Sequence, residues 1–241
     1  MKGYNYDDKS IYTGSVDLRL DPLEPDRYLV PRNCTTIEVP EYGENQIPVF
    51  IDGKWEVQED YRGKTIYNTE TKESETVKEV GPIPDGWTLE EPCDLCKWDT
   101  DSNSWVLDID QVKNKLHSDL KNQFNKKYIN SVIHSVTIDK DIDAGTTALN
   151  NINGLLDILA NDDDTVDFRL ADNSFMTVTR AQLADMKTEI IEAGQTLYKN
   201  KWAIEAAIDA ETDAEKLNTA TIDLDNGQLV YPTTDDSTTT S

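Results

Sequence analysis

The sequence predicts an α+β protein with a β-rich N-terminal region, followed by a helix, a strand, a second helix, a β-hairpin and a long helix. Prolines predict the first region, because eight of the nine lie between residues 22 and 92, where they exclude long helices. Apolar residues that recur every three or four positions predict the later helices. T-V-D-F-R-L, from Thr165 to Leu170, alternates apolar and polar residues, which is typical of a strand with one buried face.

Two hairpins are predicted in the N-terminal region. I-P-V-F-I-D-G-K-W-E-V places Val49 and Ile51 before a D-G turn and Trp55 after it. K-W-D-T-D-S-N-S-W-V-L places Trp98 and Trp105 on either side of a polar turn. Aliphatic residues are sparse in this region, so we expect small modules that are anchored by aromatic side chains and completed by a partner.

The first helix is predicted from Asp108 to Tyr128, because apolar residues recur four apart at Val112, Leu116, Leu120, Phe124 and Tyr128. A strand is expected next, over S-V-I-H-S-V-T-I from Ser131 to Ile138. The second helix follows, and its apolar face consists of Leu149, Ile152, Leu155, Leu156 and Leu159.

The C-terminal hairpin leads directly into the long helix. T-V-D-F-R-L turns at A-D-N-S and returns through F-M-T-V-T. Thr179 stands three residues before Gln182, and this capping box predicts that the helix starts at about Arg180. Within the helix, residues seven apart form a heptad-like line of Leu183, Ile190, Leu197 and Ile204.

This line has two interpretations. Its side chains either pack inside the protein against the second helix and the sheet, or form a coiled-coil seam between copies in a homo-oligomer. In a seam between copies, a buried Asn200 would fix the register of the two helices. The offset positions are Met186, Ala193, Asn200 and Ala207.

The predicted elements divide the chain into four parts. They are a β-rich aromatic region (1–107), a connecting helix (108–130), an α+β domain (131–222) and a flexible tail (223–241). The tail is predicted because P-T-T-D-D-S-T-T-T-S, beyond Tyr231, is low in complexity.

The chain is strongly acidic, with 47 Asp and Glu against 23 Lys and Arg and a net charge of −24. Such a surface repels phosphate backbones and anionic headgroups, so neither nucleic acid nor a membrane surface is expected as a partner. The charge favours solubility, and a salt-adapted or calcium-rich setting is the alternative. No run of about twenty apolar residues and no apolar N-terminal segment occurs, so we expect no membrane span and no secretory signal.

Three cysteines, Cys34, Cys93 and Cys96, are too few for a disulfide framework, and a reducing cytosol is the simplest setting. Cys93 and Cys96 have the spacing of half a zinc site. The sequence offers no second pair, so we predict a reduced pair at a hairpin edge and no metal site. Zinc would require tertiary folding to bring Cys34 and a histidine close.

Acidic turns and histidines indicate no site either. D-x-D-x-D begins at Asp139, but Ala144 and Asn150 stand where an EF-hand requires Gly and Glu. We expect solvated turns, with weak calcium binding as the alternative. His134 is predicted to be a core histidine, on the same strand face as Val136. No nucleotide-binding motif or nucleophile–base pair occurs, so no cofactor and no catalytic residue are predicted.

The stretch from about Leu116 to Asp223 carries four features in order. They are K-K-Y-I-N-S-V-I-H-S-V-T-I-D, T-A-L-N-N-I-N-G-L-L, V-D-F-R-L-A-D-N-S-F-M-T-V-T-R-A-Q-L and W-A-I-E-A-A-I-D-A. In these features it resembles a domain of unknown function found at the C-termini of bacteriophage and prophage tail proteins. Phe168 stands where many relatives carry Trp. The N-terminal part is similar to the companion segment of such proteins, chiefly in Pro22, Pro31, Trp55, Asp60, Arg62 and Gly63.

These resemblances imply a role in tail-fibre or baseplate biology, in the virion tail or in the host cytoplasm during assembly. We predict a non-enzymatic protein that binds the tail-fibre protein as an assembly chaperone or as an accessory subunit. Its predicted contacts are exposed aromatic residues, Trp55, Trp87, Trp98 and Trp105. The alternatives are a module that binds carbohydrate or the host surface, where these tryptophans stack on sugars, and a glycan hydrolase, for which no acid/base pair stands out.

Overall fold

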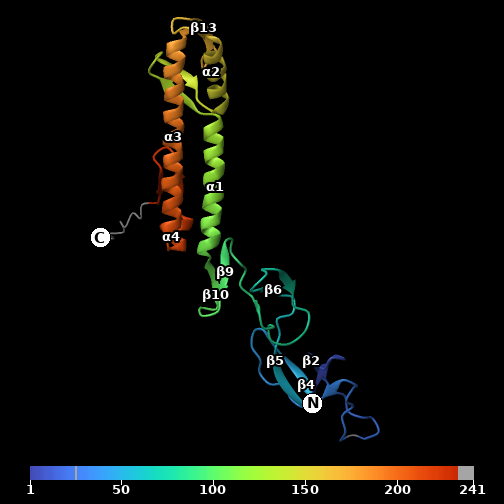
Figure 1. The fold of residues 1–241 in the computed structure, drawn as a ribbon. Helices are drawn as coiled ribbons and strands as arrows, with labels where there is room; N and C mark the ends of the chain where they lie inside the picture. Colours follow the sequence, from blue (N-terminus) through green and yellow to red (C-terminus); the bar gives the residue numbers. More distant parts are fainter. Residues whose placement is uncertain (25, 233–241) are drawn as a thin grey trace, which may run out of the picture. The chain divides into compact units, whose positions relative to one another are not determined.

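The computed structural model describes residues 1–24 and 26–232 (Figure 1). It confirms the α+β fold class, with many short antiparallel hairpins and a long C-terminal helix. The chain divides into two compact units, Met1–Val106 and Leu107–Ser241.

The first unit is built from short strands that pair in antiparallel fashion. The strands are β1 (Lys2–Tyr6), β2 (Tyr12–Asp17), β3 (Cys34–Thr35), β4 (Gln46–Ile51), β5 (Lys54–Glu59), β6 (Thr65–Asn68), β7 (Ser74–Thr76), β8 (Trp87–Thr88), β9 (Cys96–Asp99) and β10 (Ser104–Leu107). They form two three-stranded sheets, β2-β1-β3 and β7-β6-β8, and two hairpins, β4-β5 and β9-β10.

Both predicted hairpins of this unit are confirmed. At the tip of β4-β5, Asp52 and Gly53 have φ angles of 50° and 80°. Positive φ at both central residues is the requirement of a two-residue turn that matches the twist of its strands, and D-G meets it at low cost. Ile11 forms an isolated bridge with Val49, and both side chains are buried, so this hairpin packs with the first sheet.

Cys93 and Cys96 form a disulfide, so the prediction of a reduced pair is wrong. Leu95 adopts a φ of 57°, and the tight turn brings the two Cα atoms to 5.5 Å, within the range that a disulfide spans. Cys96 is buried, with 1% of its surface exposed. Sulfur atoms in a disulfide are not the thiolates that zinc requires.

The second unit contains the predicted helices. Its elements are α1 (Ile109–Ile129), β11 (Val132–Ser135), β12 (Lys140–Asp143), α2 (Thr146–Ile158), β13 (Thr165–Arg169), β14 (Phe175–Thr179), α3 (Arg180–Ala210), α4 (Ala214–Asn218), β15 (Thr221–Asp223) and β16 (Gln228–Val230). The capping box is confirmed, because Thr179 and Gln182 exchange hydrogen bonds at the start of α3.

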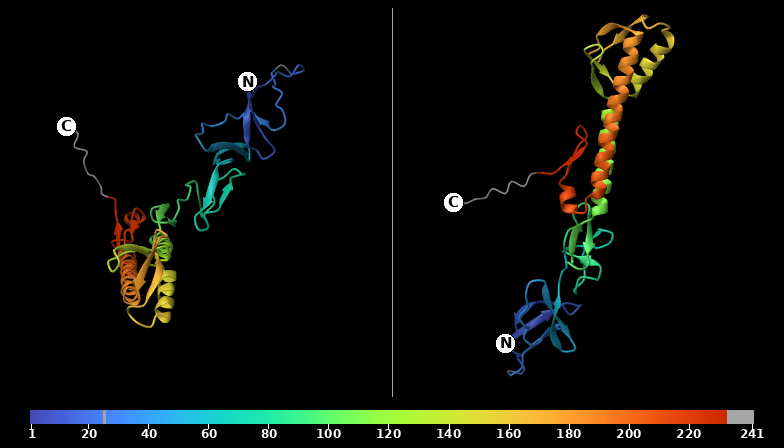
Figure 2. Two further views of the ribbon diagram at one scale, coloured as in Figure 1. Left: turned by 90° about the horizontal axis from the view of Figure 1, so that it is seen from above. Right: turned by 60° about the vertical axis from the view of Figure 1, so that its left-hand side comes forward.

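Two regions of burial lie along α3. Its first half packs with α2 and the hairpins β11-β12 and β13-β14 around a core that includes Ile142, Ile152, Val178, Leu183 and Met186. Its second half lies beside α1, as Figures 1 and 2 show, and α4 also packs against α1. The side chains buried there include Leu116, Leu120, Ile204, Ile208 and Leu217.

The strand predicted from residue 131 to 138 is shorter, and its inward face is the other one. Ile133 and Ser135 turn inward, so His134 lies on the opposite face with 56% of its side chain exposed. Val136 lies in the turn and is 81% exposed. The prediction of a core histidine is therefore wrong. The hydrogen-bonded carboxylate of Asp141, 3.0 Å from Nδ1, raises the pKa of His134.

A hairpin stands where the flexible tail was expected to begin. β15 and β16 pair antiparallel, and Leu224 in the turn is 5% exposed. Asn200 of α3 donates from Nδ2 to the carbonyl oxygens of Leu224 (3.1 Å) and Asp225 (2.7 Å). The predicted seam role of Asn200 is thus replaced by a contact inside the unit. Residues 233–241, the last nine of the 19 residues of the predicted tail, lie outside the described residues.

The end of α3 depends on an ionised carboxylate. Glu211 accepts hydrogen bonds from the Lys216 ammonium (2.5 Å) and from the backbone N–H groups of Thr212 and Asp213. The Lys216 hydrogen bond, followed by that of Asp213, lowers the pKa of Glu211 from 4.5 to about 2. The ionised Glu211 therefore stabilises the folded state above pH 4.5, and this stabilisation is lost as the pH falls to about 2.

We predict that Glu211→Gln reduces the loss of thermal stability between pH 4.5 and pH 2. The amide cannot be protonated in this window, so the pH-dependent contribution disappears. The measurement is Tm by circular dichroism across the window, with Glu44→Gln, an exposed carboxylate of the first unit, as control. Curves for Glu211→Gln and the parent that run parallel across this window would contradict the assignment.

Candidate functional site

Trp55 is the centre of an aromatic cluster in the first unit. Its ring centroid lies 5.0 Å from Phe50, 5.6 Å from Tyr12 and 6.1 Å from Tyr6. The indole N–H donates to the carbonyl oxygen of Ile37 at 2.9 Å. Trp55 is half-buried, so much of its surface is used to hold β5 against the first sheet.

Trp98 and Trp105 are brought together across β9-β10, with their rings at 5.3 Å in an edge-on arrangement. The Trp105 indole donates to the carbonyl oxygen of Glu90 at 3.0 Å, and Lys72 Nζ lies 5.8 Å above the ring. Trp87 lies in β8. All four predicted tryptophans are half-buried rather than fully exposed. Trp55 packs with Phe50, Tyr12 and Tyr6, whereas Trp98 and Trp105 pack with each other, so the tryptophans belong to separate aromatic clusters.

Sequence reasoning missed a group of exposed aliphatic side chains in the first unit. Backbone hydrogen bonds from Leu29 N to Arg19 O (2.9 Å) and from Asp21 N to Arg27 O (2.8 Å) hold two segments side by side. On this loop Leu20, Leu23, Leu29 and Val30 have exposed fractions of 47–90%, and we call these four residues the aliphatic loop. These residues follow no helical or strand period, so periodicity gave no signal for them.

The predicted oligomer seam lies inside the second unit. Leu183 and Ile204 are 0% exposed and Ile190 is 3% exposed, whereas Leu197 is half-buried. Side chains that are buried in a single copy are not available to a second copy. The structure thus places these residues as the intramolecular interpretation expects.

A second line of α3 is exposed instead, and sequence reasoning missed it. Exposed fractions are 38% for Ile191, 37% for Tyr198 and 58% for Trp202. With Gln195 these residues are spaced four, three and four apart, which places them on one helical stripe. We call Ile191, Gln195, Tyr198 and Trp202 the aromatic stripe.

Aromatic contacts join this stripe to α1. The Tyr198 ring lies 4.8 Å from Phe124, 5.6 Å from Tyr128 and 5.8 Å from Trp202. Phe124 is buried and Trp202 is not, so the rings lead from the interior of the unit to its surface.

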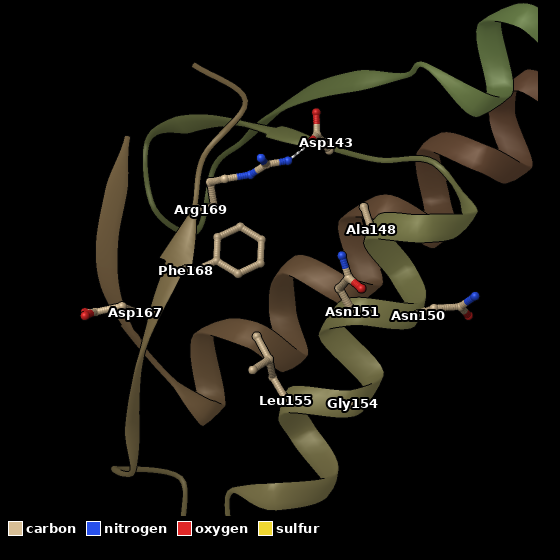
Figure 3. Close-up of a pocket in the computed structure, with 9 residues that line it drawn as sticks. All are labelled: Asp143, Ala148, Asn150, Asn151, Gly154, Leu155, Asp167, Phe168 and Arg169. Carbon is tan, nitrogen blue, oxygen red and sulfur yellow. Dashed lines mark ion pairs between the residues drawn. The ribbon is translucent and has the colours of Figure 1, made fainter. Parts of the chain in front are cut away.

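A polar hollow of about 410 Å³ lies between α2 and β13 (Figure 3). Its lining includes the ring of Phe168, the amide of Asn151 and the guanidinium of Arg169, which lies 4.0 Å from Asp143. Figure 3 shows Asp167 pointing away from Phe168, and its carboxylate accepts a hydrogen bond from Thr177 at 2.8 Å. The hollow has the chemistry to hold a polar ligand, but its two carboxylates do not converge.

Residues 1–24 and 26–232 contain neither a metal-holding cluster nor a membrane-spanning helix. No group of three or more His, Cys, Asp or Glu side chains there is arranged to hold a metal ion. Among the helices of the described chain, none is long and apolar enough to cross a membrane.

Comparison with known proteins identifies relatives of the chain. Residues 111–223, from the start of α1 to the end of β15, match the model of a domain of unknown function, DUF4376. Two curated relatives are each 31% identical over 96 residues: the "Tail fiber assembly protein" of Escherichia phage lambda and the "Prophage tail fiber assembly protein homolog TfaR" of Escherichia coli strain K12. The predicted resemblance to phage tail fibre assembly proteins is confirmed.

The similarity to these tail fibre assembly proteins is partial. The match covers 39% of this chain, 48% of the lambda protein and 49% of TfaR. The chain thus spans about half the length of the curated relatives it matches. No solved structure matches the chain.

Proposed function

We propose that this protein is a non-enzymatic tail fibre assembly factor, which binds the fibre protein as a chaperone or remains on it as an accessory subunit. The observation that carries the proposal is the 31% identity to two proteins named for tail fibre assembly. The protein would act in the host cytoplasm during assembly, or in the virion tail if it stays bound.

The aliphatic loop is the surface of the first unit best suited to the fibre protein. Leu23 is 90% exposed, and three further aliphatic side chains of the same loop are about half exposed. Exposed apolar side chains grouped together favour protein–protein contact, because burying them is favourable. The loop lies in a unit with 11 basic and 23 acidic side chains. A basic patch on the fibre protein would therefore raise the rate at which the two proteins associate.

The predicted tryptophans have a supporting role in this proposal. Trp55 and Trp105 donate their indole N–H groups to backbone carbonyls of their own unit, and Trp98 packs on Trp105. They hold the hairpins in place, and the exposed part of each ring, with that of Trp87, adds to the contact surface.

We predict that Leu23→Asp with Leu29→Asp weakens co-purification with the fibre protein of the same phage by about tenfold or more, because a few apolar anchors carry most of the binding energy of an interface. The measurement is affinity pull-down after co-expression, with circular dichroism to confirm folding. The control is Val136→Asp, which changes an 81% exposed side chain of the second unit.

The two failures of this experiment are distinct. If the parent protein does not bind the fibre protein at all, the assembly function is wrong. If the parent binds and the double variant binds equally well, the function stands and the aliphatic loop is not the contact.

Carbohydrate binding is a second candidate function, and the polar hollow is the observation in its favour. Amide and guanidinium groups that line a hollow are suited to a sugar, whose hydroxyls accept and donate hydrogen bonds. A glycan array with the parent protein and Arg169→Ala separates this function from fibre binding. The hydrolase alternative has less support, because the side chains of Asp143 and Asp167 do not converge and Asp167 accepts a hydrogen bond from Thr177 (Figure 3).

A further inference from the structure

We propose that two copies of this chain associate through the aromatic stripe of α3, with the two helices antiparallel and Tyr198 on the two-fold axis. The proposal concerns the second unit and does not depend on binding to the fibre protein.

The stripe is the less covered side of α3, although Tyr198 at its centre packs against Phe124 and Tyr128 of α1. On the opposite side, Ile204 and Ile208 are fully buried, and Asn200 holds the turn of the β15-β16 hairpin. Trp202, in contrast, leaves 58% of its surface exposed, although tryptophan is among the side chains that gain most from burial. Exposed Trp and Tyr at helical spacing are typical anchors of protein interfaces.

A hollow and an exposed ring lie at equal distances from Tyr198 along the helix. A hollow of about 220 Å³ lies beside Gly194 and is also lined by Tyr128, Ile191 and Tyr198. Gly194 stands four residues before Tyr198, and Trp202 stands four residues after it. Each separation is about 6 Å along the helix. A two-fold axis through Tyr198 therefore places Trp202 of each copy opposite the hollow of the other, which is the requirement of an isologous interface.

Glycine makes room for this packing. Position 194 has no side chain, and a Cβ there would lie 3.6 Å from the ring of Tyr128, in ordinary contact. An alanine would fit, so the structure of a single copy does not explain the glycine. A glycine in mid-helix costs about 1 kcal/mol relative to alanine, and close approach of a partner's indole offsets that cost.

The charge of the helices also suits a second copy. The whole chain has a net charge of −24, which opposes self-association in general. Helices α1 and α3 together carry nine basic and seven acidic side chains. Beside Trp202, the ammonium of Lys201 is paired within the copy with the carboxylate of Glu205 (2.6 Å). The helix pair thus lacks the negative excess that would drive two copies apart.

The stripe is short, so the expected dimer is weak. From Ile191 to Trp202 it spans about 17 Å of helix, less than the extent of a standard interface. We expect a Kd in the micromolar range, roughly 1–100 μM.

The test is sedimentation equilibrium of the full chain, without fibre protein, from about 1 to about 200 μM. The parent should shift from monomer to dimer with concentration. Trp202→Glu removes the ring that is expected to enter the partner's hollow, and Gly194→Leu fills that hollow. Each variant should raise Kd about tenfold or more. Phe175→Glu is the matched control, because this residue is 70% exposed in the same unit but lies in β14, away from the stripe.

Two results would overturn the proposal. One is a parent protein that stays monomeric over the whole range. The other is a dimer whose Kd neither Trp202→Glu nor Gly194→Leu changes, provided that circular dichroism shows both variants to be folded.

Discussion

Leu183→Ala is expected to lower the free energy of unfolding of the second unit by about 2–5 kcal/mol. Leu183 is 0% exposed and belongs to the core formed by α2, α3 and two hairpins, so truncation leaves a cavity in a closely packed interior. The measurement is urea unfolding followed by helical circular dichroism, because α1, α2, α3 and α4 all lie in this unit.

Ile191→Ala is the matched control for Leu183→Ala. Both replace a branched aliphatic side chain of α3, but Ile191 is 38% exposed and lies on the aromatic stripe. At low protein concentration we expect a loss of about 1 kcal/mol or less, as for other partly exposed positions. Equal losses of stability for the two variants would contradict the assignment of Leu183 to the core and of Ile191 to the surface.

Gly145→Ala is expected to destabilise the second unit by about 1–3 kcal/mol or more, as overpacking in a closed site does. A Cβ at this N-cap of α2 would lie 2.5 Å from the carbonyl oxygen of Ile129 and 3.0 Å from that of Tyr128. Both are backbone atoms at the end of α1, so the chain itself has to move.

Gly154→Ala provides a control of opposite sign. Gly154 lies inside α2, and its Cβ would meet no atom within 4 Å. Alanine in mid-helix should therefore stabilise the unit by about 0.5–1 kcal/mol. The same urea titration measures both variants, and a Gly145→Ala protein as stable as the parent would contradict the close approach of α1 and α2.

A periodic pattern predicts that a helix has lines of apolar residues, but it does not predict which line is buried. The helix α3 has two lines of apolar residues, one through Leu183 and one through Ile191. The first is the longer in sequence and was predicted as a seam, either internal or between copies. Only the packing of α2, the hairpins and α1 shows that the first line is internal and that the second is exposed.

Local chemistry alone determined several features of this protein. The capping box at Thr179 and the four-residue period of α1 predicted helices, and D-G predicted the β4-β5 turn, because these features depend on neighbours in sequence. The tertiary structure decided the face of His134, the Cys93–Cys96 disulfide and the hairpin that Asn200 holds. The face of His134 and the hairpin contact of Asn200 depend on residues that meet only after folding, because covering elements decide whether a side chain is exposed or bonded. The disulfide closes a turn of only three residues, and the left-handed conformation of Leu95 that brings the two cysteines together appears only in the structure.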